Sequence, residues 1–386
     1  MKQSTVAVVK VRNNIEEALD KLINCLGGLD SVILPLETVM IKPDWSTEQS
    51  YESGAVTHPG LLKALVKKVL NCGTKQVLVG DASMVGLKTT EKAIHDSGID
   101  ELGLTRVKTI DFKKSEYMEV GISNALRFRR LSFPKEYMQS QVIINVPVMK
   151  THNCLPAALG LKNLKSILKD EDRKRILTFG LEEGLIDVNR IALADLTIID
   201  GIIGMDGDGP FNGTPANADV LIGSTDPLAA EAIAIEIMGF GETPIRYMEL
   251  AYQAGFGEIN LDRINLVGDP IEQVKRKFLN PAFHQRIWND GRIKINQKNA
   301  CGSCRYILNQ YLKRYEKELL AMDDDMELYM GIIDNGICGE DKCTVGIGNC
   351  TLSHKDELSM FIDGCPPSVN SLRTKLKSLK NRESQK

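Results

Sequence analysis

The chain has 386 residues, of which 43% are hydrophobic and 26% are charged, a composition typical of globular proteins. At roughly 150 residues per domain, this length predicts more than one domain. The formal net charge of −3 and the aromatic content of 5% argue against a surface for nucleic acid or for an anionic membrane.

Short apolar strands alternate with amphipathic helices through the first 270 residues. The predicted strands cover residues 4–12, 36–43, 76–80, 106–111, 141–147, 191–200, 219–223 and 262–268. The predicted helices cover residues 15–26, 59–72 and 227–238, with Thr57 and Asp226 as capping candidates. This alternation is typical of a parallel sheet with helical crossovers, and it predicts an α/β domain built on an open, mainly parallel sheet.

The polar segment 275–298 does not continue the alternation, and we place a domain boundary within it. The sequence therefore predicts an α/β domain over 1–275 and a small α+β cysteine-rich domain over 276–386. Helices are expected at 304–322 and at about 368–381, with short Gly- and Cys-bearing segments between them.

The apolar runs are shorter than the roughly 18 residues that a membrane span needs. The N-terminal stretch MKQSTVAVVKV has no small-residue cleavage pattern. We therefore expect a cytoplasmic protein without a membrane partner. In such a reducing compartment, the nine cysteines are not expected to form disulfides.

Six of the nine cysteines lie within residues 301–365, where glycines and prolines flank them. They are Cys301, Cys304, Cys338, Cys343, Cys350 and Cys365. The first two form a Cys-x2-Cys pair, whose sulfurs can reach one ion. A proline follows the last one, as in many cluster-binding loops. The alternative is a set of buried cysteines that act as small hydrophobic residues.

We expect a [4Fe–4S] cluster in this region, with a structural zinc as the alternative. The spacing is neither that of a bacterial ferredoxin nor that of a zinc ribbon. The four favoured ligands are Cys301, Cys304, Cys350 and Cys365. Cys338 and Cys343 remain as spare thiols, a second pair or alternative ligands.

A second group of candidate residues follows the predicted strand at 141–147. Lys150 and His152 lie in the next loop, and Lys162 and Asn163 follow a glycine. Because ligands bind at the carboxyl ends of the strands of parallel sheets, these side chains suit an anionic or carbonyl-bearing small molecule. We expect Lys150, His152 and Lys162 to be catalytic and Asn163 to bind substrate. The alternative is a polar loop with a structural histidine.

The loop at 200–213 contains five glycines and three aspartates, but it matches neither a phosphate loop nor an EF-hand loop. Asp206 and Asp208 are candidates for binding a substrate hydroxyl or a cation. Equally, Gly-Asp-Gly is ordinary turn chemistry. Three further polar residues at the ends of predicted elements, Asp44, His58 and Asp81, are weaker candidates.

The first domain resembles the family known as domain of unknown function 362. The matching segments are IKPDW (41–45), THPGLLKALVKKVLNCG (57–73), VLVGDAS (77–83), INVPVMKTHN (144–153), LGLKNL (159–164), IIDGIIGMDGDGPFNG (198–213) and STDPLAAEAIAIEIMG (224–239). The sequence departs from the family pattern at Glu231, where aspartate is common, and at Asp44, where asparagine is usual. The resemblance implies an appended iron–sulfur module and leaves the reaction open.

These patterns together predict an iron–sulfur redox or electron-transfer enzyme that acts on a small anionic molecule and exchanges electrons with a protein partner. Two alternatives remain. One is a non-redox binding or assembly protein with a structural zinc. The other is an enzyme with a catalytic metal held by His152 and aspartates in the first domain.

Overall fold

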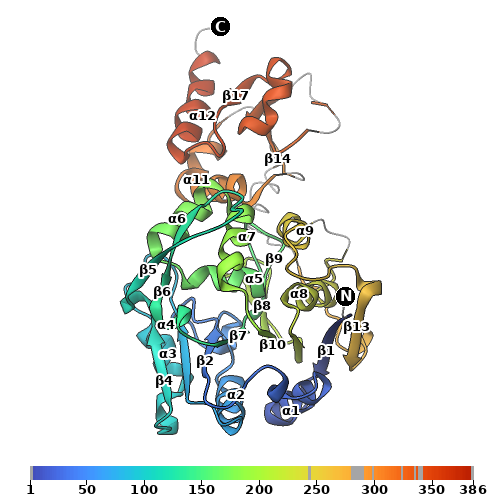
Figure 1. Cartoon of the computed structure of the whole chain (residues 1–386). Helices are drawn as coiled ribbons and strands as arrows, with labels where there is room; N and C mark the ends of the chain where they lie inside the picture. Colours follow the sequence, from blue (N-terminus) through green and yellow to red (C-terminus); the bar gives the residue numbers. More distant parts are fainter. Residues whose placement is uncertain are drawn as a thin grey trace. The chain divides into compact units, whose positions relative to one another are not determined.

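The structure of the chain is a computed structural model that describes residues 3–241, 245–279, 291–297, 300–322, 325–333, 336–337 and 342–383. The chain divides into two compact units, drawn in Figure 1. The first, the α/β unit, comprises residues 1–174 and 182–281. The second, the cysteine unit, comprises residues 175–181 and 282–386.

An 11-stranded sheet organises the α/β unit. Its strands are β1 (Ser4–Lys10), β2 (Thr38–Pro43), β3 (Gln76–Asp81), β4 (Val107–Asp111), β7 (Val142–Val146), β8 (Val148–Thr151), β9 (Ala157–Ala158), β10 (Leu196–Asp206), β11 (Thr214–Ala216), β12 (Val220–Ser224) and β13 (Ile264–Gly268). The strand order is β13-β1-β12-β10-β7-β2-β3-β4, with β8 and β11 beside β10 and β9 beside β8. β12, β9 and β11 each run antiparallel to their neighbours, and the other pairs are parallel. This confirms the predicted open, mainly parallel sheet.

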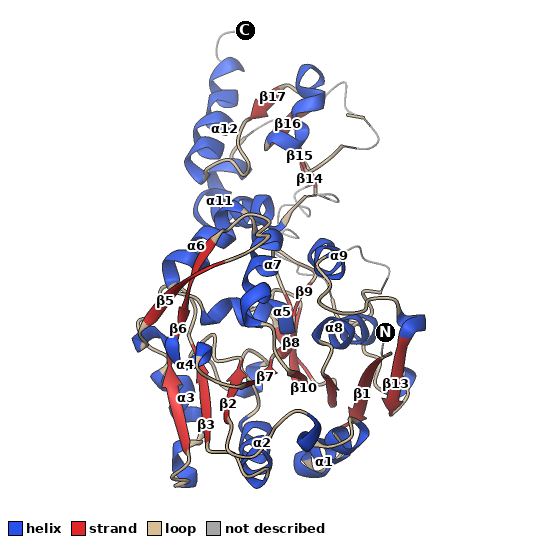
Figure 2. Cartoon of the chain, in the orientation of Figure 1, coloured by secondary structure: helices blue, strands red, loops and turns tan. Residues whose placement is uncertain are grey.

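Helices cover both faces of this sheet, as Figure 2 shows. The helices assigned to this part of the chain are α1 (Ile15–Cys25), α2 (Pro59–Asn71), α3 (Glu91–Ser97), α4 (Lys135–Met138), α5 (Gly160–Asn163), α6 (Asp170–Phe179), α7 (Leu181–Ala192), α8 (Pro227–Ile237) and α9 (Arg246–Gln253). α1 and α2 pack on one face, and α5 and α8 pack on the other. A separate antiparallel pair is formed by β5 (Tyr117–Gly121) and β6 (Arg130–Pro134).

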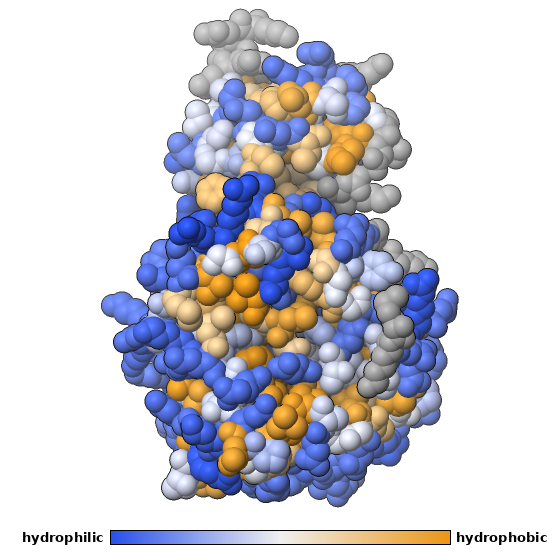
Figure 3. Space-filling view, viewed as in Figure 1, coloured by the Kyte–Doolittle hydropathy of each residue, from blue (hydrophilic) through white to orange (hydrophobic). Residues whose placement is uncertain are grey.

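Burial on both faces explains why the central strands are almost wholly apolar. β7, with the sequence VIINV, is buried along its whole length. α1 turns its apolar positions, spaced three and four residues apart, toward this core, and its glutamates face solvent. On the side of the α/β unit drawn in Figure 3, hydrophilic side chains lie mainly at the periphery and hydrophobic ones toward the middle.

Two local predictions for the α/β unit were wrong. Thr57 does not cap α2, because its hydroxyl accepts from Asp44 N (2.7 Å) and donates to Val146 O (2.8 Å). The cap is His58, whose Nδ1 accepts from Gly60 N at 3.0 Å. The strand expected from residue 191 begins at Leu196, because the residues up to Ala192 complete α7.

The cysteine unit is built on a four-stranded parallel sheet with helices, in agreement with the predicted small domain of helices and strands. Its strands are β14 (Ile293–Asn296), β15 (Met326–Met330), β16 (Cys343–Ile347) and β17 (Met360–Ile362), in that order. Its helices are α11 (Gly302–Leu320), α12 (Val369–Glu383) and the 3-10 segment η8 (Asn349–Glu357). α11 and α12 pack against each other around Tyr311, Leu308 and Leu372.

The strand β14 was missed, because it lies in the polar segment 275–298 that was expected to hold no regular element. Its alternation is short: Ile293 and Ile295 are buried while Lys294 is exposed. None of the helices in the described ranges is both long enough and apolar enough to cross a membrane.

Asp226 joins three segments of the α/β unit. Its carboxylate caps α8 through Ala229 N (2.9 Å) and also accepts from Ser4 Oγ (2.5 Å) and Glu258 N (3.0 Å). We expect Asp226→Ala to lower the free energy of unfolding by about 1–3 kcal/mol, because it leaves these donors without their acceptor. Urea denaturation measures the loss. Asp262→Ala, at an exposed position, is the control, and an equal loss in both variants would contradict the assigned role.

Candidate functional site

The carboxyl ends of β2 and β3 place a fully buried lysine beside a fully buried aspartate. The Lys42 ammonium lies 2.9 Å from Asp81 Oδ1, and neither side chain is exposed to solvent. It also donates to Asn163 Oδ1 and to Pro43 O, both at 2.8 Å. Burial lowers the pKa of Lys42, although Asp81 and Asp44 oppose this effect. Three acceptors thus match the three protons of the ammonium group.

Asn163, predicted to bind substrate, is fully engaged by the protein. Its Nδ2 donates to Asn145 Oδ1 (2.8 Å) and to Pro43 O (3.3 Å), while its Oδ1 accepts from Lys42. Asn145 lies beside Lys42 in the register of β7 and β2, and it donates to Gly160 O at 2.9 Å. Asn163 therefore fixes α5 on the sheet edge.

A second ion pair lies at the same edge. Lys150, at the end of β8, contacts Asp44 Oδ2 at 2.7 Å and donates to Ala55 O at 3.0 Å. Burial acts to raise the pKa of Asp44, but Lys150 and Lys42 outweigh it and hold that pKa below its usual value. Lys150, predicted to be catalytic, thus has a carboxylate partner of its own.

Lys162 and Lys165 differ from these paired lysines. Lys162 is the last-turn lysine of α5, and Lys165 lies in the 3-10 helix η5 (Leu164–Ile167) that follows directly. Burial and the charge of Lys150 lower the pKa of Lys162 to about 8. Burial, with Lys162 and Arg173 nearby, lowers the pKa of Lys165 well below its ordinary value. Within the described part of the chain, neither amine has a hydrogen-bond or ion-pair partner.

Arg173, in the first turns of α6, adds a further buried cation. Its Nη1 donates to Ser83 O (2.7 Å) and contacts Asp170 Oδ1 (3.2 Å). Its Nε is buried and has no partner among the described residues. Lys113 shares the carboxylate of Asp170, at 2.8 Å. We refer to Lys42, Lys150, Lys162, Lys165 and Arg173 as the cation cluster.

His152 lies next to this cluster as a neutral imidazole. Burial and the charges of Lys162, Lys165 and Lys150 lower its pKa well below 6.5. Its Nδ1 accepts from Cys154 N at 3.0 Å, so the ring proton is on Nε2. Cys154 is buried, and a negative charge on its sulfur would raise the pKa of both Lys162 and Lys165.

The two aspartates predicted from the 200–213 loop have different surroundings. Asp206 Oδ1 accepts from the backbone N–H groups of Gly207 and Leu279, which ties the end of β10 to a distant segment. Asp208 has one buried carboxylate oxygen without a partner among the described residues. Among the described residues, neither aspartate forms a hydrogen bond or an ion pair with the cation cluster.

A buried glutamate anchors α5 from behind. Glu231 lies in the otherwise apolar helix α8, accepts from Leu161 N, and accepts from Tyr247 Oη at 2.7 Å. Burial raises the pKa of Glu231 to about 7, against the effect of these two donors. The helix that carries Lys162 is therefore held from both the sheet and α8.

In the cysteine unit, two of the predicted ligands follow adjacent strand ends. Cys350 comes three residues after β16, and Cys365 comes three residues after β17. The two loops are tied by Gly348 N to Ile362 O (2.8 Å) and Asn349 N to Gly364 O (2.9 Å). Both cysteines are exposed. Because β16 and β17 are parallel, these loops emerge at the same sheet edge.

The other two predicted ligands begin α11. Cys301 is its N-cap residue, and Cys304 lies in its first turn and is buried. Gly348 has a φ of +91°, and a Cβ there would lie 3.3 Å from Cys304 Sγ. Glycine therefore allows the Cys350 loop to approach this sulfur closely.

The Cys304 thiol interacts with each of the other three thiols. A hydrogen bond with Cys301, burial, and the charges of Cys301, Cys350 and Cys365 together raise the pKa of Cys304. Among the described residues, no group of three or more His, Cys, Asp or Glu side chains is arranged to hold a metal ion. These four residues are named the thiol group.

The remaining cysteines of the unit lie elsewhere. Cys343 begins β16, roughly 13 Å of strand away from the end that leads to Cys350. It thus faces the opposite edge of the sheet from the thiol group. Cys338 lies outside the described residues.

Sequence reasoning missed Lys42, Asn145, Lys165 and Arg173. Lys42 had a recognisable signal, since it is a single charge at the end of an otherwise apolar strand. Lys165 lies three residues from Lys162, which is the spacing of one helix face. Arg173 had none, because it lies in a highly charged helix.

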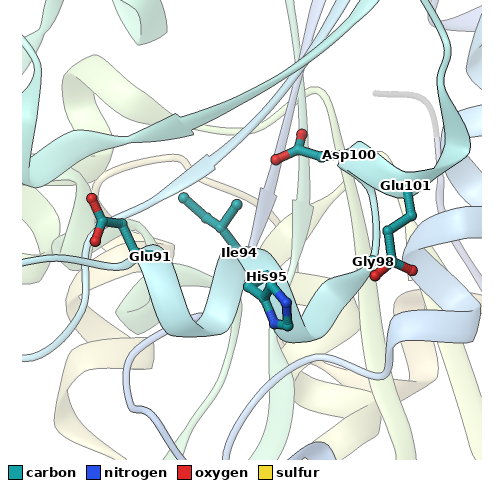
Figure 4. A pocket seen from close by; sticks show the side chains of 6 residues that line it. All are labelled: Glu91, Ile94, His95, Gly98, Asp100 and Glu101. Carbon is teal, nitrogen blue, oxygen red and sulfur yellow. The ribbon is translucent and has the colours of Figure 1, made fainter.

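A surface pocket of about 250 Å³ lies apart from these groups, on α3 and the turn after it. Figure 4 shows its lining by Glu91, His95, Asp100 and Glu101, together with Ile94 and Gly98. Glu91 pairs with Lys114, and Asp100 accepts from Thr109 Oγ1 at 3.0 Å. The pocket shares no residue with the cation cluster.

Comparison with known proteins finds a family match over residues 39–236, to the family described as "Domain of unknown function (DUF362)". This segment contains the whole cation cluster. The thylakoid-associated protein sll1697 of Synechocystis sp. (strain ATCC 27184 / PCC 6803 / Kazusa) is 26% identical over 246 residues, which are 62% of this chain and 74% of that protein.

Two solved structures are also similar to the chain. The lactate racemase apoprotein from Thermoanaerobacterium thermosaccharolyticum is 12% identical with a TM-score of 0.44, over 88% of this chain and 71% of that one. A protein from Thermotoga maritima is 14% identical with a TM-score of 0.33, over 62% of this chain and 58% of that one. Likenesses of this size carry no functional conclusion.

The buried pair Lys42–Asp81 yields a stability prediction. We expect Asp81→Asn to lower the free energy of unfolding by about 3–5 kcal/mol, because it leaves a buried ammonium without its counter-ion. Asp96→Asn, which removes the exposed partner of Lys92, is the matched control and should cost no more than about 1 kcal/mol. Equal losses in the two variants, measured by urea denaturation, would show that Lys42 does not need Asp81.

Lys162 yields a pH prediction for the ligand-free protein. Its folded pKa of about 8 lies below the ordinary 10.5, so below pH 8 both the folded and the unfolded states carry the charge. Between about pH 8 and 10.5 the folded state gives up the proton first, which relieves the cost of burial. The stability of wild type relative to Lys162→Gln should therefore rise across this window. A flat difference, or the same rise relative to exposed Lys169→Gln, would contradict the assignment.

Proposed function

The chain belongs to the DUF362 family, and on that premise we propose that it is a cytoplasmic iron–sulfur redox protein that acts on a small anionic substrate. The α/β unit would bind the substrate, and the cysteine unit would hold the cluster. The observation that carries the substrate class is the pair of lysines, Lys162 and Lys165, that have no counter-ion in the described part of the chain.

The lysines support an anionic substrate because a buried cation without a partner is costly. The ammonium groups of Lys42 and Lys150 each lie less than 3 Å from an aspartate carboxylate. A lysine with a structural role in this part of the chain is thus paired with a carboxylate. Lys162 and Lys165 would instead be satisfied by a bound carboxylate or phosphate. Their lowered pKa values favour release of the proton when no anion is present.

His152 supplies the acid–base group of the proposed site. Because Nδ1 accepts from Cys154 N, the proton is on Nε2, which has no partner among the described residues. In that state it can donate a hydrogen bond to an anion, and it can exchange a proton with a substrate. Lys150 would contribute positive charge at the site rather than a free donor, since Asp44 and Ala55 occupy it.

The thiol group supports the cluster proposal. The four cysteines lie on three segments, and Cys304 interacts with each of the other three. Four cysteine thiolates are the donor set of a [4Fe–4S] cluster. Such a cluster supplies single electrons when bound. A structural zinc, the alternative, would use the same four thiolates in a closed tetrahedral shell. Exposure of Cys350 and Cys365 favours a redox centre that an electron-transfer protein can approach.

Anaerobic purification tests the cluster proposal. We expect a brown protein with absorbance near 400 nm and about four irons per chain, because four thiolates hold one cluster. Cys301→Ser should lose most of the iron. Cys343→Ser is the control, because Cys343 lies at the opposite sheet edge, and it should keep the iron.

Two outcomes would overturn the redox proposal. Stoichiometric zinc in place of iron would favour the structural alternative. A colourless, iron-free wild type after anaerobic reconstitution would remove the cluster altogether. Equal iron loss from the Cys301 and Cys343 variants would contradict the assignment of the ligands.

A further inference from the structure

Every carboxylate that interacts with the cation cluster already has a cation of its own. Asp81 pairs with Lys42 at 2.9 Å, and Asp44 pairs with Lys150 at 2.7 Å. Asp170 is shared by Lys113 and Arg173. Among the described residues, these pairs leave no carboxylate to pair with Lys162 of α5 or Lys165 of η5.

Of the two lysines, Lys165 gives the stronger evidence for a ligand, because it is only 5% exposed. A lysine this deeply buried ordinarily has a carboxylate or several carbonyl acceptors, as Lys42 does. No residue in the described ranges offers either to Lys165. The neighbouring Nε of Arg173, which is 4% exposed, is a second buried donor without an acceptor.

The two amines lie on one side of a continuous helical path. Asn163 and Leu164, between them, both have right-handed helical φ and ψ, so residues three apart share a face. Lys162 lowers the pKa of Lys165, and both lysines lower the pKa of His152, in line with amines that lie close together. One small ligand could therefore contact both.

We infer that the site accepts a small oxyanion with at least two negative charges, such as a phosphate monoester or a dicarboxylate, held by Lys162 and Lys165. A monoanion would leave one buried ammonium uncompensated, whereas a dianion satisfies both. This inference rests on the proposed anionic substrate, names its charge, and adds Lys165 as a binding residue. It does not depend on the cluster.

Calorimetry with three probes on the full-length protein tests the inference. We expect inorganic phosphate or succinate to bind at least about tenfold more tightly than acetate, since a second charged hydrogen bond contributes that much. The dianion that binds more tightly shows whether the site takes a phosphate or a dicarboxylate. Iron content is measured on the same samples, so loss of the cluster and loss of anion binding are separate results.

Lys165→Met separates a binding role from a structural one. It should weaken binding of the better dianion by about tenfold or more. The ligand-free variant should unfold at the same or a higher urea concentration, because a buried amine that lacks a partner is replaced by an apolar side chain. Lys169→Met, four residues on and exposed, should change neither. A second variant, Lys162→Gln, changes a half-buried position. It should also weaken binding of the dianion more than binding of acetate.

The inference is overturned by any of three results. One is acetate binding as tightly as both dianions. Another is full dianion affinity in Lys165→Met. The third is no binding of phosphate or succinate to wild type that retains its iron.

Discussion

The ion pair between Lys42 and Asp81 is the interaction on which the edge of the large sheet depends. Both side chains are fully buried, so each charge is tolerable only with the other present. Asp81 also accepts from Trp45 N (2.7 Å) and from Ser166 Oγ (2.6 Å). One carboxylate thus joins the segment after β2 to the 3-10 helix that carries Lys165.

The same pair begins a chain of hydrogen bonds that anchors α5, the short helix that carries Lys162. Lys42 holds Asn163, Asn163 holds Asn145, and Asn145 holds the first carbonyl of α5. Glu231 fixes the opposite side of that short helix. A four-residue helix is not stable alone, so these polar anchors define where it lies. The unsatisfied lysines are therefore held in place before any ligand arrives, which reduces the ordering cost of binding.

The two units use one architectural rule for different chemistry. In each, parallel strands end at a common edge, and the loops that leave them bring side chains from distant parts of the sequence together. In the α/β unit these side chains are cations, which suit an anion. In the cysteine unit they are thiols, which suit a soft metal or a cluster. The edge is set by the sheet, and the chemistry is set by a few loop residues.

The sequence by itself determined the main strands of the large sheet, its mainly parallel character and the helices α1, α2 and α8, because apolar periodicity and turn residues are local properties. It also led to the prediction that Lys150, His152, Lys162 and the four cysteines carry the chemistry. The sequence did not predict the cap at His58, because that cap depends on a hydrogen bond between Asp44 N and the Thr57 hydroxyl. It did not predict the strand β14, because that strand is only four residues long.

Only the tertiary structure decided which of these residues are already satisfied. The local sequence does not show that Lys150 pairs with Asp44 whereas Lys162 has no partner among the described residues. Nor does it show that Cys350 and Cys343 lie at opposite ends of the small sheet. The distinction depends on partners that are about 90 to 120 residues away along the chain, such as Asn163 for Lys42 and Ala55 for Lys150. Pairing between such distant residues is fixed by the order of the strands, and strand order is not encoded in any single stretch of sequence.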